Sequence, residues 1–230
     1  IYQSDQRKPG AFDSRIRFSS DGGMSLRFLF LLLVIALQSA CGGLEPMPGD
    51  TFYRLKELNT GAVGEKVAPW TEQSLAVERF RANGIYKDRA IALLQDDGVS
   101  LNQSKYHYWN DSPEILLQER FVEHALKQGI AGTVTSDISS DAEYVVMGRI
   151  LRFERTRIAS ATHAVTIGLD LAVRRARSGR EILYQEQLNF TQTMDDGEMP
   201  SAINLFSVGL DQLFTQFIEK ATLSLSGTHH

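Results

Sequence analysis

The sequence predicts a single compact domain of the α/β (α+β) class, with a mixed, largely antiparallel sheet packed against two main amphipathic helices. Three observations predict this class. Short strand-like runs come first, between residues 51 and 109, and a helical period follows from residue 112. Two long alternating runs then form a hairpin over residues 163–193, and a second helical period closes the chain. This order favours one sheet covered by helices.

An apolar segment precedes the predicted domain. If translation starts at Met24, Arg27 supplies one positive charge and residues 28–37 (FLFLLLVIAL) supply an apolar run, which is the layout of a secretory signal peptide. Ten apolar residues are too few for a membrane-spanning helix, which needs roughly 20. The only cysteine, Cys41, lies where bacterial lipoprotein signals place the thiol that receives a diacylglyceryl group.

The lipobox departs from its usual form. Such a box reads Leu, Ser or Ala, Gly or Ala, Cys, whereas Gln38 takes the first position here and the leucine is displaced to Leu37. The alternative is an ordinary secretory signal cut near Ala40, which would leave Cys41 as a lone thiol in an oxidising compartment. Lipidation removes that liability, so we expect residues 24–40 to be a lipoprotein signal peptide and Cys41 to be acylated.

Charge narrows the range of partners. Five of the 24 basic and three of the 28 acidic residues precede Cys41, which leaves 19 and 25 and a net charge of −6. This balance argues against nucleic acid, which requires a basic stripe, and against electrostatic docking on anionic lipid. Membrane attachment would then come from the acyl chains. Gly42, in place of an aspartate, favours the periplasmic face of the outer membrane.

Both ends of the chain are expected to lie outside the fold. Residues 1–23 are polar and aperiodic, and they are predicted to be an upstream, disordered segment. Residues 226–230 are predicted to be a disordered tail. Residues 41–50 are rich in glycine and proline and are predicted to be a lipidated tether, whose nine residues after Cys41 reach at most about 30 Å. The predicted domain covers residues 51–225.

Short strands are predicted in the first half of the domain. Residues 51–56 (TFYRLK) form the first strand, and residues 59–73 form a loop in which Trp70 is expected to be a packed anchor. Residues 75–82 alternate imperfectly and favour a strand. Two turn signals that contain glycine divide residues 83–109 into a meander of two or three strands.

The period becomes helical after Asp111. Ser112 or Asp111 can cap the helix, Pro113 suits its first turn, Glu114 has capping-box spacing from Asp111, and Gly129 closes the segment. The apolar residues fall on adjoining rows and predict one broad face toward a sheet. They are Ile115, Leu117, Phe121, Val122, Ala125 and Leu126.

Long strands dominate the second half. Residues 133–135 are predicted to be a brief strand, and residues 144–155, apolar on both faces at first, to be a central strand covered on both sides. Alternation is clearest over residues 163–174, which indicates a half-buried strand. Residues 182–190 turn back on it as a hairpin.

The closing helix is predicted over residues 201–223, introduced by Pro200. Its length predicts that it lies across the whole sheet. One stripe carries Phe206, Leu210, Leu213, Phe214, Phe217 and Ala221, and the predicted polar face carries Asp211, Gln212, Glu219 and Lys220.

Candidate catalytic groups are few. The sequence contains no glycine-rich phosphate loop, no GxSxG elbow, no paired-cysteine metal spacing and no HExxH. The acidic pairs Asp96-Asp97 and Asp195-Asp196 adjoin glycines and are predicted to be solvated turn residues, since an acid-base pair needs a cleft that separates their pKa values. We therefore expect no enzyme activity, no catalytic residue, no metal and no cofactor.

An aromatic cluster is the remaining candidate site. Aromatic residues are enriched at interfaces, so Tyr106, Tyr108 and Trp109 are low-ranking candidates for contact with a partner or with lipid. Packing of a strand end on the following helix is the favoured alternative. A metal at His107 with Asp111 is a further alternative, and a structural role for that histidine is favoured over it.

The order of these motifs resembles the ABC-type transport auxiliary lipoproteins, the PqiC-like family. The likeness rests on the lipobox cysteine, on FYRL at residues 52–55, on the segment IYKDR at residues 85–89 and on Trp109 just before a helix. It covers roughly residues 51–225, which is nearly the whole mature chain. The sequence departs from the family at Gln38, and at residues 90–92, where the family often has a proline and a tyrosine-arginine pair.

The resemblance implies a non-enzymatic outer-membrane lipoprotein that works beside MCE-domain proteins, membrane permeases and a cytoplasmic ATPase. Such systems move phospholipids or other hydrophobic molecules between the inner and outer membranes. It also implies a compact α/β sandwich with a mixed sheet, and a homo-oligomer, because some members form rings around the tip of the MCE assembly.

The predicted function is therefore that of an anchored docking module. Cys41 would hold the protein in the membrane while the domain binds the MCE component. Two rivals stay open. One is a lipoprotein chaperone or plug of an outer-membrane barrel, and the other is a periplasmic hydrolase, for which these residues supply no evident nucleophile, base and oxyanion donor.

Overall fold

The structure is a computed structural model that describes residues 47–58, 66–137, 141–158, 162–177 and 181–227. Pro48–His230 form one compact unit. The predicted upstream segment, the signal peptide and Cys41 lie outside the described residues. Among the described helices, none combines the length and the hydropathy needed to span a bilayer.

Within the described residues, nine strands form one mixed sheet, which confirms the predicted fold class. The strands are β1 (Thr51–Tyr53), β2 (Thr71–Val77), β3 (Arg81–Ala82), β4 (Ala90–Leu94), β5 (Leu101–Trp109), β6 (Ala131–Thr135), β7 (Tyr144–Arg157), β8 (His163–Arg175) and β9 (Ile182–Met194). The helices are the short 3₁₀ helix η1 (Gly84–Lys87), α2 (Pro113–Gln128) and α3 (Met199–Gly227).

Strand β7 organises the sheet. On one edge it pairs antiparallel with β8, which in turn pairs antiparallel with β9, as the predicted hairpin requires. On its other edge it pairs in parallel with β2, then β3, then β4. Strand β6 extends the sheet beside β2, and β5 and β1 extend it beside β4. The parallel pairings are short and the antiparallel ones are long, so antiparallel pairing dominates by length.

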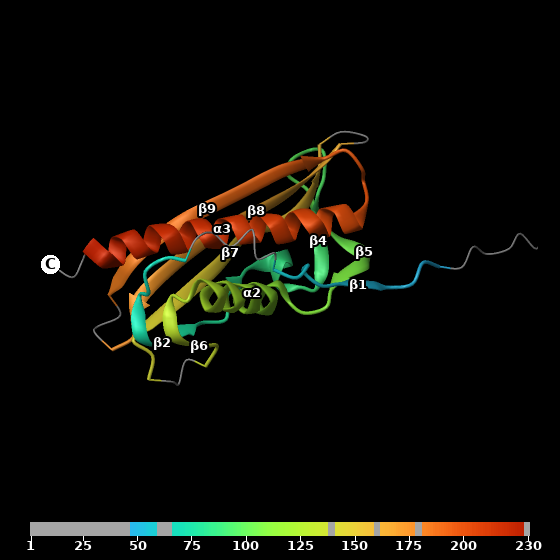
Figure 1. Ribbon diagram of the computed structural model, residues 1–230. Helices are drawn as coiled ribbons and strands as arrows, with labels where there is room; N and C mark the ends of the chain where they lie inside the picture. The colour runs from blue at the N-terminus through green and yellow to red at the C-terminus, as the bar shows by residue number, and fades with distance from the viewer. Residues whose placement is uncertain (1–46, 59–65, 138–140, 159–161, 178–180, 228–230) are drawn as a thin grey trace, which may run out of the picture. The chain divides into compact units, whose positions relative to one another are not determined.

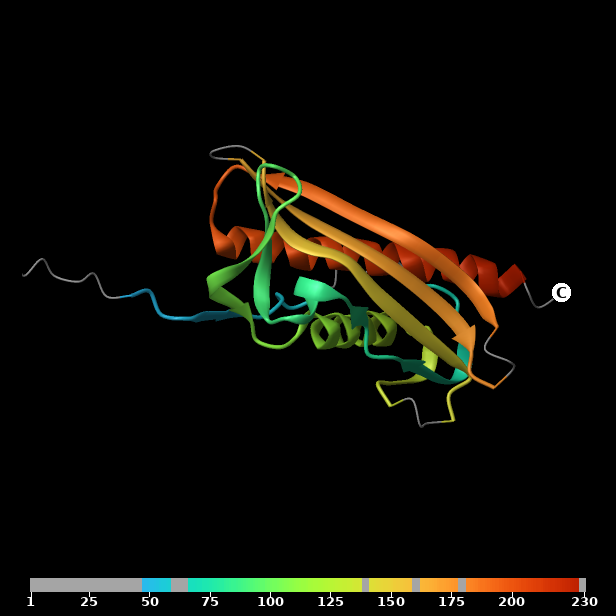
Figure 2. The same ribbon diagram turned by 180° about the vertical axis from the view of Figure 1, so that it is seen from behind.

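Helix α3 packs on the long strands β7, β8 and β9, and α2 lies beside it (Figure 1). The prediction that α3 lies across the whole sheet is therefore wrong, because α2 packs against β2, β3 and β6. The view from behind shows the opposite face of β8 and β9, over which no described helix lies (Figure 2). The core between helices and sheet is aromatic. Its largest fully buried side chains are Trp109, Tyr144, Phe80, Phe121, Phe153, Phe206, Phe214 and Phe217.

Helix α2 ends as predicted but begins differently. Gly129 adopts the left-handed conformation (φ 67°) at the C-terminal end, where glycine carries no steric penalty. Ser112 occupies the N-cap position but makes no side-chain cap bond. The capping-box role predicted for Glu114 is wrong, because its carboxylate instead accepts the backbone N–H of Ala82 at 3.0 Å and so joins the helix to β3.

The predicted apolar face of α2 is also partly wrong. Leu126 is 57% exposed, whereas Arg120 and His124 are buried on the face that packs inward. Helix α3 departs in the same way, since Asp211, expected on a polar face, is only 3% exposed. These polar residues are buried because they bond one another between the two helices.

Strand β8 is not half-buried as predicted, because nearly all of it is inaccessible to solvent. Its outward row consists of small or short residues, among them Gly168 and Asp170. A Cβ at Gly168 would lie only 3.3 Å from the Cβ of Arg152 and 3.2 Å from the Asn189 side chain. Longer side chains of β7 and β9 therefore close over this row.

The first half of the domain follows the prediction with shifted boundaries. Residues 75–82 are not one strand, since β2 starts at Thr71 and ends at Val77 before the two-residue β3. Trp70 is a packed anchor, as predicted. It is 6% exposed, and its Nε1–H donates to Thr222 Oγ1 at 2.7 Å, which fastens this segment to α3.

Candidate functional site

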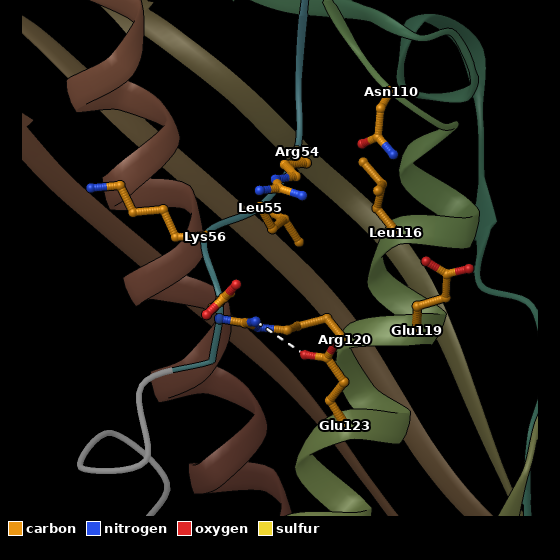
Figure 3. A pocket seen from close by; sticks show the side chains of 9 residues that line it. Arg54, Leu55, Lys56, Asn110, Leu116, Glu119, Arg120 and Glu123 are labelled. Carbon is orange, nitrogen blue, oxygen red and sulfur yellow. Dashed lines mark hydrogen bonds and ion pairs between the residues drawn. The ribbon is translucent and has the colours of Figure 1, made fainter.

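The most distinctive surface lies where the chain joins the domain. We call residues 52–58 the leading segment. The Lys56 backbone N–H donates to Ser207 Oγ on α3 at 2.9 Å, and Lys127 Nζ on α2 donates to the Leu58 carbonyl at 2.9 Å. The leading segment thus runs between α2 and α3 (Figure 3), and these two hydrogen bonds join it to both helices.

Over residues 52–56, the side chains of the leading segment alternate between solvent and core, and Glu57, which is exposed like Lys56, interrupts the alternation before Leu58. Leu55 packs against the core and Leu58 is 7% exposed, whereas Arg54 and Lys56 are exposed. Extended backbone places successive side chains on opposite faces, so this alternation follows from the sequence RLK. Among the described residues, neither the Arg54 nor the Lys56 side chain has a hydrogen-bond or ion-pair partner.

Three adjoining hollows border the leading segment. One of about 260 Å³ lies against α2, and its lining includes Arg54, Leu116 and Arg120 (Figure 3). Another of about 620 Å³ lies against the start of α3, where Phe52, Leu55, Pro200 and Ile203 supply apolar walls. A third of about 520 Å³ adjoins the end of β9. Lys56 lines all three, so one exposed cation borders each hollow.

A buried ion cluster lies beside the first hollow. Arg120 on α2 makes a bidentate pair with Asp211 on α3, with Nε–Oδ1 and Nη2–Oδ2 distances of 2.7 and 2.9 Å. His124 Nε2 lies 3.1 Å from the same Oδ1. The side chains of Arg120, Asp211 and His124 are 4%, 5% and 0% exposed. A charge held at this depth must be paired to persist, so the cluster joins the two helices in one arrangement.

One polar atom of the cluster has no partner. His124 Nδ1 is buried and makes no hydrogen bond, and the imidazole meets the Phe214 ring edge-on at 5.7 Å. The apolar pattern of the two helices did not predict this cluster. The available signal was that Arg120 and His124 are one helical turn apart and lie beside the buried residues Leu117 and Phe121 on the same side of α2.

The exposed side of the leading segment carries aromatic and cationic groups. The Phe52 ring lies 5.6 Å from the Tyr108 ring, and the guanidinium of Arg89 lies 5.1 Å from the Phe52 ring centroid. Phe52 is nevertheless 56% exposed. We define the N-terminal surface as Phe52, Arg54, Leu55, Lys56, Arg89 and Tyr108.

The other side of β1 is polar. The hydroxyl of Tyr53 shares a hydrogen bond of 3.0 Å with His107 Nδ1, and the two rings are 5.7 Å apart. Burial, and to a lesser extent the charge of Glu198, raises the pKa of Tyr53, so the phenol stays neutral at physiological pH. His107 therefore has a structural partner on β1.

The predicted site residues fall in different places. Cys41 lies outside the described residues. Tyr106 and Tyr108 are partly exposed on β5, so contact with a partner stays a prediction for them. Trp109 is 1% exposed, stacked on Phe153 at 5.1 Å. It forms part of the core and presents no surface to a partner. Trp109 directly follows Tyr108 on β5, and successive side chains of a strand point to opposite faces, so Trp109 points inward.

The segment IYKDR, which carries part of the family resemblance, connects strands. Tyr86 donates its hydroxyl hydrogen to the buried carboxylate of Glu154 on β7, and burial together with that bond raises the pKa of Tyr86. Arg89 Nε donates to the Trp109 carbonyl at 3.1 Å. These bonds hold η1 against β7 and β5, so the motif has a structural role here.

The acidic pairs lie at turns. Bonds from the Ser100 hydroxyl and from the Ser100 and Val99 amides hold the pKa of Asp97 below its usual value. Asp196 accepts the Ser201 hydroxyl at 2.7 Å just beyond the start of α3. Within the described ranges, no three His, Cys, Asp or Glu side chains are grouped as a metal site would require.

Comparison with known proteins finds solved structures of similar fold. No family model and no curated protein matches the sequence. The crystal structure of XCC0632 from Xanthomonas campestris, which carries the family label DUF330, matches with a TM-score of 0.62 and 17% identity over 77% of this chain and 98% of that chain. An uncharacterized protein matches with a TM-score of 0.58 and 12% identity over 75% and 98%. The hypothetical protein CT253 from Chlamydia trachomatis reaches 0.48, with 12% identity over 68% and 99%. The first two show that this chain shares their fold.

Proposed function

We propose that the protein is a lipid-anchored, non-enzymatic envelope protein that serves as the auxiliary docking component of an MCE-type ABC transport system. Cys41 anchors it on the periplasmic face of the outer membrane, residues 42–50 form the tether, and the domain binds the MCE-domain protein. The system moves lipids or other hydrophobic molecules between the two membranes. A homo-oligomer belongs to the same proposal.

The observation that carries the proposal is the position of Cys41, directly after an apolar run and only nine residues before a folded domain. A short apolar run with a cysteine at its end fits a cleaved and acylated signal better than a spanning helix. The leading segment adds support. Its hydrogen bonds to α2 and α3 fix the segment that follows the tether to both helices of the domain.

The transport role rests on the family resemblance. Three of its motifs have defined places in the fold: residues 52–55 begin the leading segment, residues 85–89 brace β7, and Trp109 is at the centre of the aromatic core. The mixed sheet with two packed helices agrees with the sandwich that the resemblance implies. This agreement supports the assignment, while the partner itself comes from the resemblance alone.

The test is to express the chain from Met24 with its own signal and to solubilise the membranes in mild detergent. Mass spectrometry then identifies the N-terminal modification and the co-purifying proteins. We expect acylated Cys41 and an MCE-domain protein in the same preparation, and a Cys41→Ser variant that is neither acylated nor retained in membranes is the control.

Other outcomes of this experiment would reject parts of the proposal. A free Cys41, or an N-terminus elsewhere, would reject the lipid anchor. An acylated chain that co-purifies only with an outer-membrane barrel would favour the chaperone or plug. A separate assay that found substrate turnover, abolished by a single polar substitution, would favour a hydrolase.

A further inference from the structure

We propose that the N-terminal surface rests on the bilayer that holds the acyl chains of Cys41, with Phe52 at the level of the lipid headgroups. The inference builds on the proposed anchor and adds which side of the domain meets the membrane. The molecule that contacts this surface is phospholipid.

The length of chain before the domain limits where the membrane can be. The nine residues of the tether reach at most about 30 Å when fully extended, and any slack shortens that distance. The tether joins the domain at β1, which contains Phe52. The N-terminal surface therefore surrounds the point at which the tether enters the domain, and no other part of the domain is joined to Cys41 by a shorter length of chain.

The composition of this surface suits a bilayer interface. An exposed Phe52 packs beside Tyr108 and Arg89, and the adjacent hollow of about 620 Å³ has apolar walls from Leu55, Pro200 and Ile203. Tyrosine favours the membrane–water interface because it combines an apolar ring with a polar hydroxyl, and phenylalanine adds an apolar ring that inserts at the boundary of the acyl chains. An acyl chain fits such a hollow, because water makes few hydrogen bonds with its apolar walls.

The cations of the surface are placed to reach phosphates. Arg54, Lys56 and Arg89 are all exposed, and their aliphatic stems can lie along apolar groups while their charged ends remain in the headgroup layer. Acidic residues line the same hollows, with Glu57, Glu119 and Glu123 in the first and Asp195 and Asp196 in the third, so these cations do not make the surface net positive. Contact with zwitterionic phosphatidylcholine is therefore sufficient, and anionic lipid is not required.

Two other exposed apolar residues define the alternatives. Val99 is 82% exposed at the β4–β5 turn, and Leu223 is 74% exposed near the end of α3. Leu223 is 20 residues beyond Ile203, which lines the hollow next to Phe52, so it is roughly 30 Å away along the helix axis. A domain that rests on the N-terminal surface keeps Leu223 away from the acyl chains.

The test uses tryptophan fluorescence, because both native tryptophans are buried: Trp70 is 6% and Trp109 is 1% exposed. The full chain with F52W, V99W or L223W is anchored through Cys41 in vesicles of phosphatidylcholine with brominated acyl chains. Bromine quenches an indole only at close range. We expect most of the added emission of F52W to be lost relative to plain vesicles, while V99W and L223W lose little.

Each outcome decides the question. Quenching of V99W or L223W in place of F52W would overturn the proposal, as would the absence of quenching in all three variants, which would leave the N-terminal surface for a protein partner. If natural acylation fails, the lipid anchor of the proposed function is rejected by mass spectrometry. The orientation is still tested, because a maleimide lipid coupled to Cys41 supplies the same point of attachment. Circular dichroism before reconstitution confirms that each variant is folded.

Discussion

The pair Arg120–Asp211 and the pair Arg149–Asp170 join the same chemical groups at different depths. Between α2 and α3, both side chains are inaccessible, at 4% and 5% exposure. On the outer face of the sheet, Asp170 is 9% exposed but Arg149 is 52% exposed, at an Nη2–Oδ2 distance of 2.8 Å. Because the two distances are alike, this difference in depth predicts that the two pairs contribute differently to stability. The inner pair fixes how two helices pack, whereas the outer arginine covers a strand of small residues.

The largest effect is expected from a substitution of Asp211 in the inner pair. Asp211→Asn removes the buried counter-charge of Arg120 and leaves the guanidinium with only the half-exposed Glu123 as a charged partner. Loss of one partner of a buried pair typically costs about 3–5 kcal/mol. We expect the free energy of unfolding in urea to fall by about that amount. His124 would lose its charged partner in the same variant.

A neighbouring residue supplies the matched control for Asp211. Glu123 also pairs with Arg120, at 3.1 Å, but is 54% exposed, so Glu123→Gln should cost at most about 1 kcal/mol. An equal, small effect of the two substitutions would mean that the inner pair does not hold the helices together.

A second substitution tests the outer face. Asp170 accepts bonds from Arg149 Nη2 and Gln185 Nε2, both at 2.8 Å, and Asp170→Ala removes both. Because Arg149 can then turn into water, we expect a loss of only about 1–2 kcal/mol in urea unfolding. Arg149→Gln is the control, and it should cost less than Asp170→Ala. A cost as large as that of Asp211→Asn would show that exposure does not grade these pairs.

The same contrast explains what the sequence could predict. Alternation over residues 163–174 and the helical stripe of residues 201–223 predict the inward faces of β8 and α3 correctly, because apolar side chains there bury themselves whatever surrounds them. Asp211 and Asp170 were not predictable. Each is covered by an arginine from another element, Asp211 by Arg120 on α2 and Asp170 by Arg149 on β7, and periodicity does not show which arginine makes the contact.

The candidate site also contains one part that local sequence predicts and another that depends on tertiary contacts. The lipobox places Cys41 by local sequence, so the anchor needs no tertiary information. The N-terminal surface needs it, because Phe52 meets Tyr108 and Arg89 only through the parallel pairing of β1 with β5. The paired residues, such as Thr51 and His107, are 56 positions apart, so the parallel pairing leaves no short-range signal. A three-residue strand is also too short to predict its own neighbour.

The smallest expected effect concerns Glu186, which pairs with Lys220 at side-chain exposures of 20% and 47%. Burial alone would raise the pKa of Glu186, but bonds from Lys220 and Tyr184 and the charge of Lys220 outweigh it and hold the pKa below the usual 4.5. A carboxylate whose pKa falls on folding stabilises the protein at pH values above its unfolded pKa, and this contribution disappears as the pH falls through the folded pKa. The unfolding free energies of the native chain and of Glu186→Gln should therefore differ by less than about 1 kcal/mol near neutral pH and converge in acid. Urea unfolding at about pH 6 and about pH 3 measures this, and a gap that stays constant or widens in acid would contradict it. Lys220→Met is the matched control, because loss of the ammonium lets the pKa of Glu186 rise and so weakens the same pH dependence from the other partner.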